Sequence, residues 1–154
     1  MDMSDDLMNE KTTITTDFEW EIQSMKTTEE VFKILLDVRK WWSGFYSEEI
    51  NGKTEKVDDV FTFKAGNHYS KQMLVQLIPQ KRIVWEVVES NLGFVDNNYE
   101  WLNTQLIFII TKLEDSTKVL FVHKGLTPML ECFQACSSAW TWYLENRLSP
   151  LLKN

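Results

Sequence analysis

The sequence predicts an α+β domain in which a curved antiparallel sheet wraps around one long C-terminal helix. Three observations support this fold class: strand-like segments recur between residues 60 and 125, only short links separate them, and the last segment repeats apolar residues at helical spacing. A sheet that grips a helix in this way often encloses an apolar pocket. The candidate functional surface is therefore expected inside the protein.

The first expected elements are a strand and a helix. Apolar and polar residues alternate over 18–23, which is typical of a half-buried strand. Thr27 with Glu30 three residues later fits a capping box and predicts that a helix begins there. The apolar face of this helix consists of Val31, Phe32, Leu35 and Leu36. Residues 39–42 are expected to begin a second short turn.

The central part of the chain is expected to form six strands. A short strand is predicted within the connection 44–56, and Gly66 marks a turn after the next strand. Pro79 ends the strand after that turn, and residues 91–100 form a loop. The remaining strands are predicted at 60–63, 69–78, 82–89, 101–113 and 117–125, the last two forming a hairpin around 114–116.

The last element is a long helix with clear expected ends. Thr127 is a good N-cap, and Pro128 fits the first helical position, where its missing N–H costs nothing. Pro150 is expected to end or kink the helix near Ser149. The apolar face consists of Leu130, Phe133, Trp140, Leu144, Leu148 and Leu151, widened by Met129, Cys136 and Tyr143.

Composition restricts the function classes. The 154 residues fit one domain, and we assign 1–16 to a polar N-terminal lead-in and 17–154 to a single domain. A formal net charge of −7, with dispersed Lys and Arg, argues against nucleic acid and against anionic membrane surfaces as partners. The longest apolar run, 106–110, is too short to span a bilayer.

The cysteines and the N-terminus indicate a cytoplasmic protein. The acidic start of the chain has no basic segment followed by an apolar run, so it does not resemble a signal peptide. Cys132 and Cys136 lie four residues apart on the expected last helix, and two free thiols in a reducing compartment are the simpler interpretation. The alternative is a thiol pair that binds metal or senses redox state.

These features together resemble the START-like superfamily, also called SRPBCC or birch-pollen-allergen-like proteins. Within it, the chain is most similar to the domain family named after activators of the heat-shock protein 90 ATPase. The resemblance spans residues 17–152, and its order and spacing carry it more than any single motif. The residues that carry it are Val31-Phe32, Trp41-Trp42, Phe61 and Phe63, Pro79, Trp85, Trp101 with Thr104, Thr117, His123 with Gly125, and Trp140 with Leu144 and Leu148.

The resemblance implies a helix-grip fold, with a cavity between sheet and C-terminal helix as the usual ligand site. The superfamily includes lipid carriers, polyketide cyclases, hormone receptors and co-chaperone domains, so fold alone does not settle function. Ala139 stands where a glycine commonly precedes the helix tryptophan. The sequence has no room for the separate N-terminal domain of complete chaperone activators, so a full co-chaperone role is not expected.

The candidate ligand-binding residues are mostly aromatic. Seven Trp and nine Phe are many for this length, and such residues line pockets as well as filling cores. His123 is expected on the concave strand face, where it either orients a polar ligand group or bonds to a nearby backbone or hydroxyl group at the rim of the sheet. The predicted set is Trp42, Phe63, Trp85, Trp101, Phe121, His123 and Trp140.

No catalytic residue, metal ligand or cofactor is assigned. The sequence has two histidines and lacks zinc, phosphate-loop, dinucleotide and nucleophile-elbow motifs. The leading hypothesis is a protein that binds a small apolar or aromatic molecule. The alternatives are a cyclase or hydratase that uses His123, Tyr99 or Tyr143, and an interaction module that contacts a chaperone or forms a homodimer through Leu120 and Val122.

Overall fold

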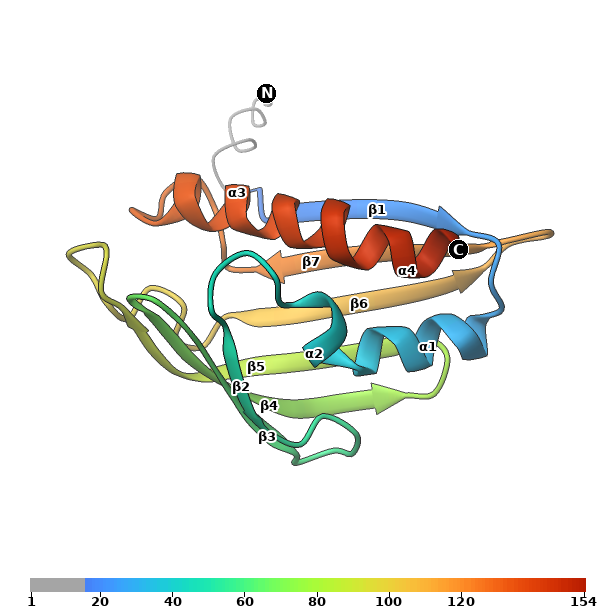
Figure 1. Ribbon diagram of the computed structural model, residues 1–154, viewed down its shortest axis with the longest axis horizontal. Helices are drawn as coiled ribbons and strands as arrows, with labels where there is room; N and C mark the ends of the chain where they lie inside the picture. The colour runs from blue at the N-terminus through green and yellow to red at the C-terminus, as the bar shows by residue number, and fades with distance from the viewer. Residues whose placement is uncertain (1–15) are drawn as a thin grey trace, which may run out of the picture.

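The computed structural model describes residues 16–154, and Figure 1 shows its arrangement. The predicted lead-in 1–16 lies outside the described residues apart from Thr16, so its boundary stays a prediction. All helices pack on one face of a single sheet (Figure 1). Within the described residues, no helix is long and apolar enough to cross a membrane.

Seven antiparallel strands form the sheet in the order β1-β7-β6-β5-β4-β3-β2. The predicted α+β helix-grip fold is therefore confirmed. The strands are β1 (Phe18–Ser24), β2 (Glu49–Gly52), β3 (Val60–Ala65), β4 (His68–Ile78), β5 (Arg82–Leu92), β6 (Gln105–Lys112) and β7 (Thr117–Lys124). The predicted strand at 82–89 thus continues for three residues more.

The helices cover the concave face of this sheet. They are α1 (Thr28–Leu36), α2 (Val38–Trp41), α3 (Phe133–Tyr143), a π-helical segment η2 (Leu144–Leu148) and α4 (Ser149–Lys153). The expected capping box is present, because Thr27 and Glu30 each bond the other's backbone N–H. The predicted inward face of α1 is buried at Val31 and Leu35.

The last helix begins at Phe133, later than the predicted start after Thr127. The Thr127 side chain accepts from the Met129 N–H at 3.3 Å, but this closes only an isolated turn. The carboxylate of Glu100, in a distant loop, accepts hydrogen bonds from the N–H groups of Glu131 and Cys132. A cap from a neighbouring residue is therefore unnecessary. Met129 does not widen the apolar face, because 73% of it is exposed.

Pro150 does not end the C-terminal helix. It lies in the first turn of α4, where no N–H is required. The wider turn of η2 directly precedes α4 and accommodates the change of helical type. The chain therefore remains helical to Lys153 and keeps Leu144, Leu148 and Leu152 buried.

Trp101 is not on a strand, in contrast to the prediction that β6 would begin there. It lies in a turn closed by the Thr104 N–H bond to its carbonyl at 3.0 Å. Asn103 adopts a φ of 67° in this turn, and its N–H bonds to the carbonyl of Val87 at 2.9 Å. The turn still directs the Trp101 side chain inward, where it is buried.

Candidate functional site

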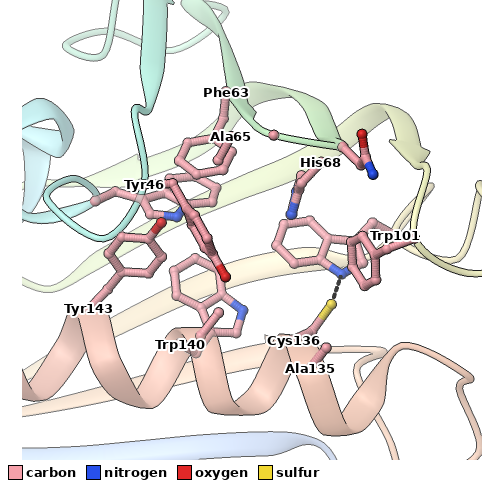
Figure 2. A pocket seen from close by; sticks show the side chains of 14 residues that line it. Tyr46, Phe63, Ala65, His68, Trp101, Ala135, Cys136, Trp140 and Tyr143 are labelled. Carbon is pink, nitrogen blue, oxygen red and sulfur yellow. Dashed lines mark hydrogen bonds between the residues drawn. The ribbon is translucent and has the colours of Figure 1, made fainter.

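A cavity of about 370 Å³ lies between helix α3 and the end of the sheet formed by β3, β4 and their turn. Figure 2 shows the aromatic side chains around it. Its lining consists of Trp42, Tyr46, Phe63, Ala65, Gly66, Asn67, His68, Phe94, Trp101, Ala135, Cys136, Ala139, Trp140 and Tyr143. The small side chains on α3 and in the β3–β4 turn leave this end of the helix-sheet space unfilled.

Three tryptophans from separate segments stack along the cavity wall. The ring of Trp101 is nearly parallel to that of Trp140, at 9° and a centroid distance of 5.9 Å, and lies at 23° to that of Trp42. Trp42 in turn stacks on Phe63 at 4.0 Å. Offset stacking of this kind is the favoured aromatic geometry. The wall therefore presents several rings in similar orientation.

The predicted site residues divide into two groups. Trp42, Phe63, Trp101 and Trp140 line the cavity. Trp85, Phe121 and His123 do not line it; they are buried in the core between the sheet and the helices, and Trp85 packs edge-on against Phe61 at 4.8 Å. The predicted residues divide in this way because the concave face of the sheet is long. It holds a filled core at its centre and a cavity at one end.

His123 has both ring nitrogens engaged. Trp140 Nε1 donates to His123 Nδ1 at 2.9 Å, and His123 Nε2 lies 2.9 Å from Thr104 Oγ1. The Thr104 hydroxyl donates onward to the Trp101 carbonyl at 2.6 Å. Burial lowers the pKa of His123 to about 3, so the ring is neutral at pH 7. The expected alternative of a histidine bonded to a backbone or hydroxyl group therefore holds for the hydroxyl of Thr104, but the ring lies in the core and not at the rim of the sheet. The ring has no nitrogen left for a ligand.

His68 is not among the residues predicted to bind a ligand. It begins β4, borders the cavity and meets the face of Trp101 edge-on at 4.5 Å (Figure 2). Its Nε2 is buried without a hydrogen-bond partner among the described residues. Burial lowers the pKa of His68 to about 4. One feature of the sequence could have indicated His68, namely the polar residues at every second position of this strand. Ser70 and Gln72 lie on the same face of β4 as His68, and both are buried.

The carboxylate of Glu48 holds the loop that follows α2 beside the cavity. Glu48 accepts hydrogen bonds from the N–H groups of Gly44, Phe45 and Tyr46, and from the Tyr143 hydroxyl at 2.7 Å. Burial opposes ionisation of Glu48, but these hydrogen bonds lower its pKa overall. Burial raises the pKa of Tyr143 most, and the hydrogen bond to Glu48 raises it further, so the hydroxyl stays protonated. These hydrogen bonds hold Tyr46 at the rim of the cavity.

A second carboxylate fixes the start of α3. Glu100 accepts from the N–H groups of Glu131 and Cys132, both at 2.8 Å. The two cysteines are free, and Trp101 Nε1 donates to Cys136 Sγ at 3.2 Å (Figure 2). The hydrogen bond with Cys132 lowers the pKa of Cys136 most, against the opposing effect of burial. Trp101 and the helix start are therefore fixed together.

The fold is a helix-grip fold, as the resemblance implied, and solved structures share it. The chain is similar to the solution structure of the Aha1 dimer from Colwellia psychrerythraea, with a TM-score of 0.70 and 20% identity over 90% of this chain and 96% of that one. It is also similar to protein CV1439 from Chromobacterium violaceum, with a TM-score of 0.66 and 15% identity over 89% and 96%. The sequence matches no family model and no curated protein.

Proposed function

We propose that this protein binds a small aromatic molecule in the cavity beside α3. The observation that carries the proposal is the wall of stacked rings around about 370 Å³ of space. Pockets for small molecules commonly start at about 300 Å³ and are lined mainly by apolar and aromatic side chains. Burial of ligand surface contributes about 25 cal/mol per Å² before association costs are subtracted.

The direct test fills the cavity with a side chain. Ala139 lines the cavity, whereas the neighbouring Ser138 lies on the exposed side of α3 and does not. We expect naphthalene to bind the unmodified protein in isothermal titration calorimetry, Ala139→Leu to weaken binding at least tenfold (about 1.4 kcal/mol), and Ser138→Leu to leave it unchanged. Absence of heat with the unmodified protein, or equal affinity in both variants, would overturn the proposal.

Native mass spectrometry of gently purified protein supplies an independent measurement. A small molecule that stays bound in the native spectrum and leaves on denaturation would identify the ligand's mass. We also propose a cytoplasmic location, which the two free thiols of the described residues support. Rapid maleimide trapping before lysis, followed by detection of a Cys132–Cys136 disulfide, would contradict that location.

The second candidate function is self-association. The Colwellia protein is described as a dimer, and this chain exposes 38% of Phe45 and 62% of Tyr46 beside the cavity rim. The predicted patch at Leu120 and Val122 is only half-buried rather than fully exposed. Light scattering at increasing protein concentration tests this candidate: a constant monomer mass would remove it.

A further inference from the structure

Within residues 16–154, the cavity has no charged partner for an ionised ligand. None of the lining residues in this described part of the chain is Asp, Glu, Lys or Arg. The two nearby carboxylates are already engaged, Glu48 with the Tyr143 hydroxyl and backbone N–H groups and Glu100 with the start of α3. An ion that entered would lose hydration without compensation. The cavity therefore favours an uncharged molecule.

The ring orientations favour a flat ligand. Trp101 and Trp140 lie 9° from parallel, and Trp42 lies 14° from the plane of Phe63. At most 2% of each of these residues is exposed, so a ligand meets the margin of the stack, where a planar ring system continues the offset geometry that aromatic pairs prefer. A tetrahedral cation, by contrast, is best enclosed by faces that surround it.

One buried side-chain nitrogen beside the cavity has no hydrogen-bond partner among the described residues. Three buried polar atoms of the described residues make no hydrogen bond: His68 Nε2, Gln72 Oε1 and Trp85 Nε1. Of these three atoms, only Nε2 of His68 belongs to a residue that lines the cavity. A buried nitrogen without a partner is costly, and a group that bonds to it recovers that cost.

We propose that the ligand is a planar aromatic molecule with an uncharged hydroxyl group, and that this hydroxyl hydrogen-bonds to the imidazole of His68. This bond requires the imidazole ring to rotate about its Cβ–Cγ bond so that Nε2, which is buried without a partner among the described residues, faces the cavity. A hydroxyl both donates and accepts, so it pairs with either imidazole tautomer. This inference rests on the proposed function and adds the feature by which the site discriminates among aromatic molecules.

The test compares three probes that share one ring system: naphthalene, 2-naphthol and 2-naphthoate. Calorimetry is performed at pH 7 on the unmodified protein, on His68→Phe, and on Tyr69→Phe as the matched control. Tyr69 is the next residue on β4, but its hydroxyl bonds to Glu89 and it does not line the cavity. Circular dichroism establishes that each variant is folded.

We expect the unmodified protein to bind 2-naphthol about tenfold more tightly than naphthalene and 2-naphthoate most weakly. His68→Phe should bind 2-naphthol and naphthalene equally, while Tyr69→Phe keeps the preference. His68→Asn, which restores a polar group, should recover part of it. If none of the probes binds, the proposed function itself fails. If naphthalene binds as well as 2-naphthol, or the preference survives in His68→Phe, the function stands and the role of His68 is overturned.

Discussion

The indole N–H of Trp140 donates a 2.9 Å hydrogen bond to Nδ1 of His123, and this bond fixes the histidine tautomer. Because Nδ1 accepts, Nε2 carries the proton and donates to Thr104 Oγ1, whose own proton goes to the Trp101 carbonyl. The chain of bonds runs in one direction from helix α3 through β7 to the turn before β6. His123 therefore connects three segments that are distant in the sequence.

Trp140→Phe should destabilise the protein by about 2–4 kcal/mol, because it leaves His123 Nδ1 buried without a donor and removes ring volume from the core. Urea unfolding measures the loss. Trp142→Phe is the matched control, since Trp142 is only half-buried on the same helix. Equal losses in the two variants would mean that the bond to His123 adds nothing.

Acid should destabilise the protein before its carboxylates titrate. The folded pKa values of His68 and His123, about 4 and about 3, lie below the ordinary value of about 6.5, so between pH 7 and 5.5 only the unfolded chain gains protons. The free energy of unfolding should therefore fall by about 1 kcal/mol per histidine over this range. Urea titrations at both pH values check this, and His68→Phe should show about half the change. An unchanged slope in that variant would contradict the assignment.

Gly125→Ala should disturb the same hydrogen-bond chain from the other side. Gly125 has a φ of 102°, and an added Cβ would lie 2.7 Å from Cγ2 of Thr104. The hydroxyl of the same threonine accepts the hydrogen bond from His123. We expect a loss of about 2–3 kcal/mol in urea unfolding, with displacement of the His123 ring N–H signal in NMR spectra. Gly66→Ala provides the control, because Gly66 also has a positive φ, of 58°, but open space around it. It should cost about 1 kcal/mol and leave the signal in place.

Glu100→Ala should loosen the start of α3. It removes the acceptor for two backbone N–H groups, those of Glu131 and Cys132, and should cost about 1 kcal/mol, comparable to the loss of an N-cap. Hydrogen exchange should accelerate at these two amides first. Glu114→Ala, in the β6–β7 turn, serves as the control for removing a carboxylate. Unchanged exchange at Glu131 would show that the helix start does not depend on Glu100.

The strands and the first helix were predictable because their signals are local. Alternation of apolar and polar residues at Phe18 to Gln23 and the capping box at Thr27 depend only on near neighbours, and both are present. The start of α3 was missed because its cap, Glu100, comes from a segment about thirty residues away. Trp101 was misplaced because the strand pattern after it begins only at Gln105.

The candidate site was harder to predict than the fold for a related reason. Aromatic residues look the same in sequence whether they only fill the core, as Trp85 and Phe121 do, or also border the cavity, as Trp101 and Trp140 do. The difference depends on how far each position lies along the sheet from the small residues of α3 and the β3–β4 turn. Which face of β4 carries His68 is likewise set by pairing with β3 and β5.

The closeness of the three stacked indoles gives the protein an intrinsic optical signal. Ring centroids of Trp42, Trp101 and Trp140 are separated by 4.9–6.4 Å, a range at which their electronic transition dipoles couple strongly. The ultraviolet circular dichroism spectrum should therefore contain an exciton couplet whose sign reports the handedness of the stack. Any molecule that wedges the rings apart would change that couplet, so occupancy can be followed without a label.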